Sequence, residues 1–191
     1  MKISGKFVLK VAGTLTIIAL VVAALLGVVD MVTRDKIDAI NVEKTNQALA
    51  AVAPEGAEFK PVELSDAAVS AAAAYGTLDS MYEMSTGGYA MKIVASGSQG
   101  SIEMIVGVDA NKALTGVSVV SHSETGGIGT KVINNDPSTA GTPVLDQFIG
   151  MSGAGSLVVG KTVTPISGAT VTSKGITAGG NAALSAVEAM G

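Results

Sequence analysis

An uninterrupted apolar run near the N-terminus constrains this chain more than any other feature of its sequence. Residues 11–29 read VAGTLTIIALVVAALLGVV and contain no charged side chain. A helix of this length spans roughly 28 Å, close to the thickness of the hydrocarbon core of a bilayer. The apolar core of a signal peptide usually has only about 7–15 residues, and no Ala-x-Ala cleavage signal directly follows this run. We therefore expect a retained transmembrane anchor.

The charges on either side of this run predict its orientation. Lys2, Lys6 and Lys10 precede it with no acidic residue among them, whereas acidic and basic residues are mixed after it, over 30–38. Positively charged flanks usually face the cytoplasm. We therefore expect residues 1–29 to form a cytoplasmic N-terminus and anchor in the cell (inner) membrane. Residues 30–56 would form a helical stalk, and residues 57–191 an extracytoplasmic domain. A pilin-like subunit would also begin with an apolar helix, but its processing site and early helical Glu are missing here.

The composition excludes several kinds of chemistry. The chain of 191 residues has 12 Lys+Arg and 16 Asp+Glu, so it lacks the basic excess of a general nucleic-acid binder. It has no Cys and a single His, His122, which excludes disulfides, iron–sulfur clusters, thiolate zinc sites and multi-His metal sites. No nucleophile–base pair or paired carboxylate set suggests hydrolysis. Any redox chemistry must therefore come from a bound organic cofactor.

The remainder of the chain predicts an α+β fold. Helical periodicity predicts a helix over 30–52, and an Ala-rich segment that starts with a Ser-Asp cap predicts a short helix over 65–75. A further short helix over 143–149 and a long final helix over 172–190 are also expected. Apolar, β-branched runs between glycine turns predict strands, at 82–85, 89–95, 102–108, 114–121 and 157–163. We expect a curved antiparallel sheet with helices packed on it.

One apparent nucleotide-binding motif is rejected. Residues 155–162, GSLVVGKT, match the phosphate-loop pattern G-x-x-x-x-G-K-[ST]. That loop functions because it opens directly into a helix whose amides surround the phosphates. Val163, Thr164 and Pro165 follow here, and these residues do not begin a helix. We therefore do not expect a nucleotide hydrolase.

Two other segments are candidate ligand sites. In 167–173, SGATVTS, small residues and hydroxyls meet the start of a helix, where an anion such as phosphate is stabilised. From these residues alone, an ordinary helix cap made by Ser or Thr is the stronger interpretation. In 121–129, SHSETGGIG, a strand runs into a turn with three glycines, which lets a flat ligand approach the backbone. His122 can equally be a hydrogen-bonded residue at a strand end.

Together, these two segments resemble a known family. The pairing of HSETGGIG with a downstream SGATVT, behind a single membrane helix, is similar to the flavin-binding subunits of two related ion-pumping complexes. One is the G subunit of the Rnf complex, a ferredoxin:NAD oxidoreductase. The other is the C subunit of the sodium-translocating NADH:quinone oxidoreductase, which is usually longer. At 191 residues, this chain more closely resembles the G subunit.

The resemblance implies an FMN joined through its phosphate to a threonine hydroxyl by a phosphoester bond. In the family pattern, D-x-x-[ST]-G-A-[ST]-x-T, the last Thr is modified, and Thr172 occupies that position. Thr164 stands where the pattern often has Asp, and Gly126 where the family often has Pro. Further implied cofactor-binding residues come from both motifs: Ser167, Gly168, Ala169, Thr170 and Lys174 from the second, and His122, Glu124, Thr125, Gly127 and Ile128 from the first. No catalytic residue and no metal is implied.

The implied function is electron transfer within a membrane complex. The chain would relay electrons through FMN in an ion-translocating ferredoxin:NAD oxidoreductase, as a subunit and not as a stand-alone catalyst. Implied partners are the other membrane subunits, including a second flavin-bearing one, the membrane itself, and a flavin-attaching transferase during maturation, with no nucleic acid. Two alternatives stay open. One is a subunit of the sodium-translocating NADH:quinone oxidoreductase, and the other is a non-redox, membrane-anchored binding or assembly protein.

Overall fold

A computed structural model describes residues 5–191, apart from the side chains of Phe7, Asp35 and Asp38. Lys2, one of the three lysines used to predict the orientation, lies outside the described residues. The chain divides into two compact units, Met1–Glu43 and Lys44–Gly191. Helix α1 (Gly5–Val52) contributes to both units.

The first unit contains the membrane-spanning candidate. The segment Val8–Arg34 of α1 is long and apolar enough to cross a bilayer, and none of the most apolar part is buried against other residues. The hydroxyls of Thr14 and Thr16 donate to the carbonyls of Lys10 and Ala12, each at 2.9 Å. These polar groups are therefore satisfied inside the helix, as an apolar environment requires. The N-terminal apolar helix expected from the sequence is confirmed.

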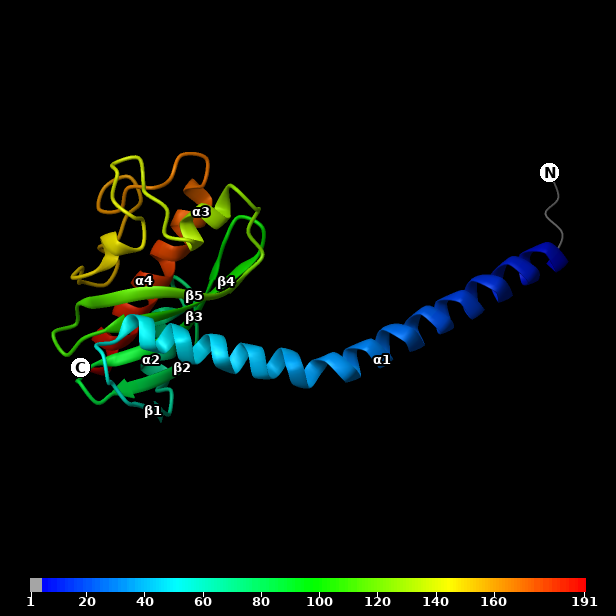
Figure 1. Ribbon diagram of the computed structural model, residues 1–191, viewed down its shortest axis with the longest axis horizontal. Coiled ribbons are helices and arrows are strands. Elements are labelled where there is room, and N and C mark those ends of the chain that lie inside the picture. The colour runs from blue at the N-terminus through cyan, green and yellow to red at the C-terminus, as the bar shows by residue number, and fades with distance from the viewer. Residues whose placement is uncertain (1–4) are drawn as a thin grey trace. The chain divides into compact units, whose positions relative to one another are not determined.

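The second unit is built on an antiparallel sheet of five strands, in the order β1-β2-β3-β4-β5 (Figure 1). Each strand pairs with its sequence neighbour. Short turns join β2, β3, β4 and β5 in succession, whereas a helix lies between β1 and β2. The strands are β1 (Phe59–Val62), β2 (Thr77–Met84), β3 (Tyr89–Ser96), β4 (Ser101–Val108) and β5 (Leu114–His122). The predicted α+β class, an antiparallel sheet with packed helices, is confirmed.

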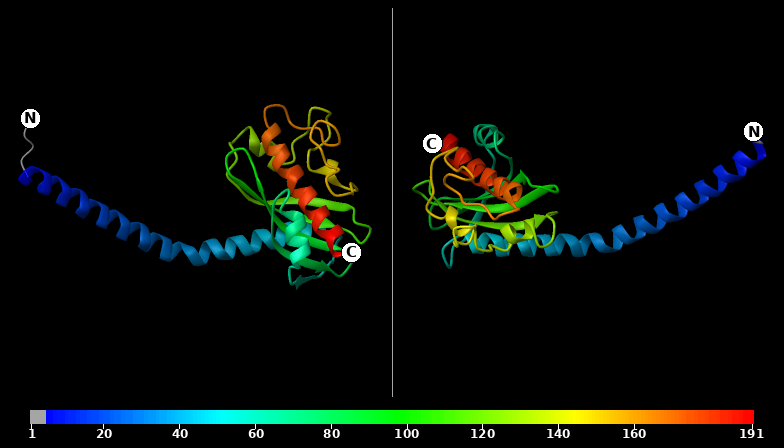
Figure 2. Two further views of the ribbon diagram at one scale, coloured as in Figure 1. Left: turned by 180° about the vertical axis from the view of Figure 1, so that it is seen from behind. Right: turned by 90° about the horizontal axis from the view of Figure 1, so that it is seen from above.

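Helices cover both faces of this sheet. On one face lie α4 (Thr170–Met190) and α2 (Asp66–Ala72), over the main hydrophobic core (Figure 2). On the other face, Ala48, Leu49 and Val52 at the end of α1 pack into a smaller cluster. The backbone of α1 lies close to β4 there: a Cβ on Gly107 would lie only 2.6 Å from the Val52 carbonyl oxygen. Glycine at position 107 leaves room for this approach. That same carbonyl also accepts a hydrogen bond from the Thr115 hydroxyl.

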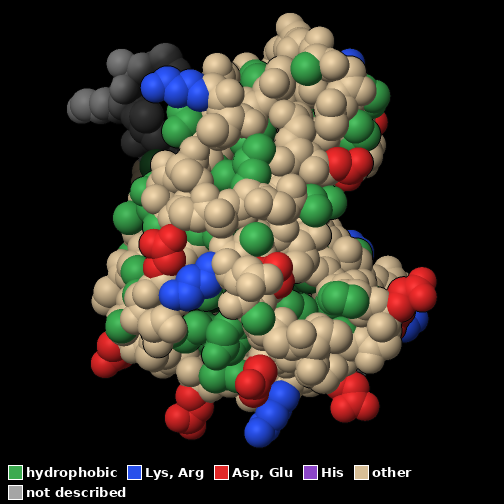
Figure 3. Space-filling view, turned by 90° about the vertical axis from the view of Figure 1, so that its left-hand side faces the viewer, with side chains coloured by type: hydrophobic (Ala, Val, Ile, Leu, Met, Phe, Trp, Pro, Cys, Tyr) green, Lys and Arg blue, Asp and Glu red, His purple; other side chains and the backbone are tan. Residues whose placement is uncertain are grey.

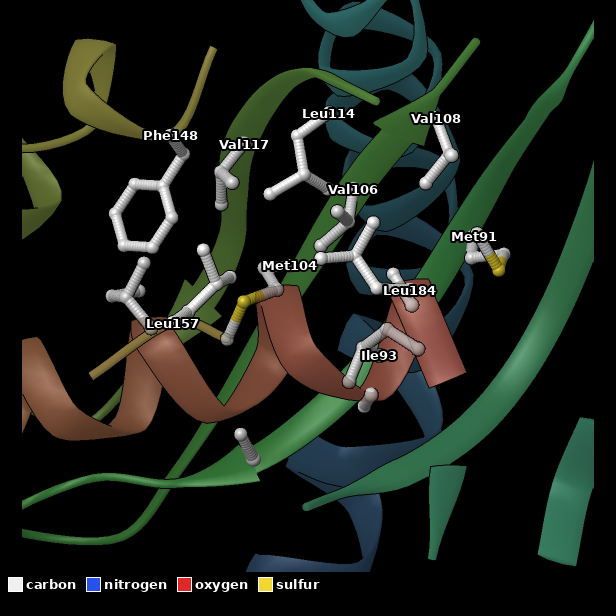
Figure 4. Packing of buried hydrophobic residues seen from close by; sticks show 14 of the residues in the cluster. Met91, Ile93, Met104, Val106, Val108, Leu114, Val117, Phe148, Leu157 and Leu184 are labelled. Atoms are coloured by element: carbon white, nitrogen blue, oxygen red, sulfur yellow. The ribbon is translucent and has the colours of Figure 1, made fainter. Parts of the chain in front are cut away.

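The main core forms where β3, β4 and β5 face α4. Met104 and Leu184 lie between the sheet and the helix, and Phe148 and Leu157 close the core at one end (Figure 4). α4 lies close to the sheet because its contact residues are small: a Cβ on Gly179 would lie 2.3 Å from the sulfur of Met104. Fourteen residues of α4 are buried, so this helix is the central support of the unit.

The long connection between β5 and α4 corrects three predictions. Residues 157–163 do not form a strand, because the left-handed backbone of Gly155 and Gly160 folds the segment into turns. The helix predicted over 143–149 is only the 3-10 turn η1 (Asp146–Phe148). The final helix begins at Thr170, two residues earlier than predicted. The short helix α3 (Gly129–Ile133) and strand β1 were not predicted at all.

The rejected phosphate-loop pattern is likewise a series of turns with no helix after it, as expected. The face in Figure 3 consists mainly of backbone and uncharged polar side chains, with scattered charges of both signs, most of them in its lower half.

Candidate functional site

The two sequence motifs meet at one buried hydrogen bond. The Thr172 hydroxyl donates to Oε2 of Glu124 over 2.5 Å, across 48 residues of sequence. Thr172 is 1% exposed and Glu124 is 7% exposed. Thr172 comes from the first turn of α4, and Glu124 from the turn after β5. The fold therefore brings together two segments that the sequence analysis paired only by resemblance.

The other oxygen of Glu124 is held by backbone. Oε1 accepts hydrogen bonds from the amides of Ser98 and Gln99, at 2.7 and 3.2 Å, in the turn between β3 and β4. The amide of Glu124 itself donates to Nδ1 of His122 over 3.2 Å, which fixes the start of its turn. Three segments of the chain therefore determine where this carboxylate lies.

Two glycines leave room for the carboxylate. A Cβ on Gly97 would lie 2.3 Å from Oε1 of Glu124, and a Cβ on Gly129 would lie 2.4 Å from Oε2. Neither glycine has a positive φ. These positions therefore require glycine for space and not for an unusual backbone conformation.

The hydrogen bonds also decide the charge state of the site. Burial of the carboxyl acts to raise the pKa of Glu124. The hydrogen bonds donated by Thr172, Gln99 and Ser98 outweigh burial and hold this pKa below its ordinary value of 4.5, and the charge of His122 acts in the same direction. Glu124 is therefore an anion at neutral pH.

A pocket of about 140 Å³ opens beside this hydrogen bond. Most of its walls are backbone, small side chains and hydroxyls, and its one ionisable lining residue is Glu124. Both motifs and the turn between β3 and β4 contribute to the lining: Ser98, Glu124, Thr125, Ile128, Gly129, Gly168, Ala169, Thr170, Val171 and Thr172.

The start of α4 supplies amides to this pocket. The first hydrogen bond of the helix runs from the Ser173 amide to the Ala169 carbonyl, at 3.0 Å. The amides of Thr170, Val171 and Thr172 precede it and, as at any helix start, have no carbonyl partner within the helix. No side chain caps the helix at Ala169. The interpretation of this turn as an ordinary Ser or Thr cap is therefore wrong.

The structure brings some of the predicted site residues together and leaves others outside. Seven of them line the pocket: Glu124, Thr125, Ile128, Gly168, Ala169, Thr170 and Thr172. Ser167 and Lys174 are exposed and lie outside its lining. Gly127 also lies outside it, although it has the positive φ, +76°, expected for its turn. His122 also lies outside this lining and accepts the hydrogen bond from the Glu124 amide. It lines a different pocket of about 510 Å³, between β5 and the end of α1.

Sequence reasoning missed Ser98, Gly129 and Val171. Ser98 lies in the turn SGSQG at 96–100, which reads as an ordinary hairpin turn because nothing in it points to a distant carboxylate. Gly129 was one of three glycines in a run, and only its distance to Glu124 and Thr172 distinguishes it from Gly126 and Gly127. The sequence analysis predicted Glu124 only as a cofactor-binding residue. In the structure its carboxylate instead accepts a hydrogen bond from Thr172 itself.

Two family models match separate parts of this chain. The family described as FMN-binding domain matches residues 97–185, which include every lining residue of the pocket. The pocket therefore lies in a region that is similar to FMN-binding domains. The family described as RnfG N-terminal region matches residues 1–52, which include all of α1. Over its N-terminal helix the chain is therefore similar to the RnfG family.

Two curated relatives are similar along most of their length. The G subunit of the Na(+)-translocating ferredoxin:NAD(+) oxidoreductase complex of Acetobacterium woodii is 29% identical, over 94% of this chain and 91% of the relative. The G subunit of the ion-translocating oxidoreductase complex of Methanosarcina acetivorans is also 29% identical, over 90% of each chain. The similarity therefore includes both the N-terminal helix and the domain with the pocket.

Proposed function

We propose that this chain is a membrane-anchored flavoprotein that relays electrons within an ion-translocating ferredoxin:NAD oxidoreductase. Its FMN is joined through the phosphate to the hydroxyl of Thr172. The observation that carries this proposal is the position of Thr172, whose hydroxyl lines a pocket between both motifs at the start of α4. The names of the two relatives support the choice of complex.

The residues present fit the phosphate end of FMN. The pocket is smaller than the about 300–1,000 Å³ of a site that encloses a whole small ligand, so it suits a phosphate and not a three-ring system. The amides of Thr170, Val171 and Thr172 and the positive end of a 21-residue helix favour an anion at this point. These groups would hold the phosphate once it is attached to Thr172.

The residues around the pocket mouth fit the ring end. Ile128 and Val171 both line the pocket and are 51% and 53% exposed, which is unusual for large apolar side chains in this unit. A planar aromatic ring placed over them would remove their apolar surface from water. FMN attached here supplies the electron-transfer chemistry, while the chain positions the ring and holds it against loss.

The anchor and its orientation belong to the same proposal. Val8–Arg34 would span the cell (inner) membrane, with the N-terminus in the cytoplasm and residues 57–191 outside. A covalent bond is useful on that side, because a dissociated flavin would be lost. The flavin-attaching transferase, the other subunits and a second flavin-bearing subunit would be the partners of this chain.

Intact-mass measurement of the full chain tests the attachment. We expect a gain of one FMN less one water and visible absorption that stays with the protein after denaturation. A chain purified from its native membrane at the bare sequence mass would contradict the proposal and favour a non-redox binding or assembly protein. Co-purified subunits of a quinone-reducing complex would instead assign the chain to the related enzyme.

Protease accessibility tests the orientation. Added to cells stripped of their wall, a protease should degrade the large unit and leave the membrane helix. Protection in such cells, together with cleavage in inside-out vesicles, would reverse the proposed topology.

A further inference from the structure

We propose that Glu124 is the general base for flavin attachment. Its carboxylate takes the hydroxyl proton of Thr172 while the hydroxyl oxygen attacks the phosphorus of the flavin phosphate. This inference rests on the proposed function, because it concerns the reaction that joins FMN to Thr172. It assigns a catalytic residue to the acceptor chain itself, in addition to whatever the transferase contributes.

The direction of the Thr172 hydroxyl is the first observation. Three other helical hydroxyls bond back to their own helix: Thr14, Ser173 and Thr177 each donate to the carbonyl four residues earlier. Thr172 instead donates out of its helix to Glu124, at 2.5 Å. The proton of the reacting oxygen is therefore already directed at a base before any donor molecule arrives.

The fixed position of the carboxylate is the second observation. The Ser98 and Gln99 amides hold Oε1, which leaves Oε2 directed at Thr172. Gly97 and Gly129 lie directly against the two oxygens, so a side chain at either position would displace the carboxylate. A general base must lie within hydrogen-bonding distance of the proton it removes, and this arrangement keeps it there.

The reaction balances without any electron transfer. The donor is a flavin dinucleotide, in which the flavin phosphate is joined to a nucleoside monophosphate through an anhydride bond. A bond forms between Thr172 Oγ1 and the flavin phosphorus, and the anhydride bond breaks to release the nucleoside monophosphate. The Thr172 proton moves to Oε2 of Glu124 and then to water through the pocket mouth. Protein kinases use an aspartate beside a substrate hydroxyl in the same way.

Proton transfer also removes an electrostatic conflict. Glu124 is the one ionisable residue that lines the pocket, and the incoming phosphate carries negative charge. While Glu124 holds the proton it is neutral and does not repel the phosphate as the new bond forms. During this step the amides at the start of α4 face the anion without opposition from Glu124.

The test is the rate at which Glu124→Gln accepts the flavin. Full-length chain in detergent, produced without transferase, is mixed with a purified flavin-attaching transferase and flavin adenine dinucleotide, and attachment is followed by intact mass. Gln keeps the size of Glu124 and retains an oxygen for the Ser98 and Gln99 amides, but it cannot accept a proton. We expect kcat to fall by about 10²–10⁴-fold, the usual contribution of a general base, while KM for the acceptor chain stays unchanged.

Glu188→Gln is the matched control. Glu188 also accepts a backbone hydrogen bond, from the Ala154 amide at 2.8 Å, but it lies far along α4 from Thr172 and does not line the pocket. This variant should accept the flavin at the wild-type rate. An equal loss in both variants would overturn the proposal, because the effect would then follow from the loss of any carboxylate charge in the second unit.

Three results separate the possible failures. A wild-type kcat in Glu124→Gln, or a loss confined to KM, overturns the role as a base, since the residue would then serve only in recognition or packing. Should Glu124→Gln fail to fold, Glu124→Asp decides: it withdraws the carboxylate by one methylene, so the proposal requires a lower kcat, and a wild-type kcat overturns it. A wild-type chain that gains no mass under any condition contradicts the attachment itself and not merely the base.

Discussion

Two long helices of this chain have similar apolar character and opposite surroundings. In α1, the most apolar part of Val8–Arg34 has no buried residue, and Leu, Ile and Val side chains project from all sides. In α4, 14 of 21 residues are buried, and many of these are Gly, Ala, Ser or Thr. Large side chains around a whole helix suit a lipid environment, whereas small ones allow a backbone to lie close to a sheet. Side-chain size therefore distinguishes the anchor from the core helix.

The hydroxyls of the two helices differ in the same way. Thr14 and Thr16 in α1 are exposed and donate to the carbonyls of their own helix, so their hydroxyl protons are already used within the helix. Thr172 in α4 is buried, and its hydroxyl leaves the helix to reach Glu124. The same residue type is thus internally satisfied in the anchor and available for chemistry at the start of the core helix.

The largest expected effect comes from removing that hydroxyl. Thr172→Val keeps the shape of the side chain but has no oxygen for a phosphoester, so we expect complete loss of covalent FMN by intact mass. Loss of a hydrogen bond to a charged group costs about 1.5–3 kcal/mol, which is small enough against a typical stability of about 5–15 kcal/mol for the fold to survive. Thr14→Val in α1 should retain the flavin.

Thr170→Val is the closer control, because Thr170 lies in the same turn and lines the same pocket. It should retain the covalent flavin. If Thr172→Val retained covalent FMN and Thr170→Val lost it, Thr170 would be the residue that carries the flavin.

The next largest effect is a loss of stability, which should occur on substituting a glycine of α4 but not on substituting a glycine of α1. A Cβ on Gly175 of α4 would lie 2.6 Å from the Ser96 carbonyl oxygen, whereas nothing lies within 4 Å of a Cβ on Gly27 of α1. Gly175→Val should therefore lower the free energy of unfolding of the second unit by at least the about 1–3 kcal/mol typical of overpacking. Gly27→Val should leave it unchanged. Chemical denaturation in detergent measures both, and equal stabilities would show that α4 is not held as closely as described.

Local patterns explain which parts of this fold could be predicted. Strands β3, β4 and β5 were predicted nearly to their ends because each is an apolar run bounded by turn residues, glycines around β3 and Asp109 to Lys112 between β4 and β5. Strand β1, FKPV, was missed because it is short and contains Pro61. Residues 157–163 look like a strand by composition, but Gly155 just before them, Gly160 within them and a contact with Asn181 determine their course.

The site was predictable only in part, and for a tertiary reason. Resemblance identified Thr172 and Glu124 as members of two motifs. Their direct hydrogen bond spans 48 residues and depends on how β5 and α4 meet, so no local pattern contains it. The requirement for glycine at position 129 is equally tertiary, because it follows from the place of the Glu124 carboxylate.

A smaller loss of stability is expected on removing the buried side-chain amide of Asn181 in α4. The segment Val8–Arg34 of α1 contains no Asn or Gln. Asn181 is buried and bonds to both backbone groups of Leu157: its Oδ1 accepts from the amide at 3.2 Å and its Nδ2 donates to the carbonyl at 2.9 Å. Asn181→Ala leaves both groups unpaired and should cost about 1–3 kcal/mol in chemical denaturation. Asn111→Ala, in an exposed turn, should stay within about 0.5 kcal/mol of wild type. A neutral Asn181→Ala would mean that water replaces the amide.

The smallest effect is the pH dependence that Glu124 gives to the stability of the flavin-free chain. Because the pKa of Glu124 is lowered by folding, the unfolded state binds more protons as the pH falls. The contribution of Glu124 to stability is therefore complete above its ordinary pKa of 4.5 and is lost as the pH falls through the lower, folded value. It is small because burial opposes the hydrogen bonds that stabilise the anion.

Comparison of wild type with Glu124→Gln isolates this contribution. The difference in unfolding free energy should be largest near neutral pH and should shrink as the pH falls below 4.5. Thr172→Val removes one of the hydrogen bonds that lower the pKa, so its own pH profile should be flatter than that of wild type. A difference between wild type and Glu124→Gln that grows on acidification would mean that folding raises the pKa of Glu124, so that burial outweighs the three hydrogen bonds. The buried hydroxyl at the start of α4 would then not stabilise an anion as described.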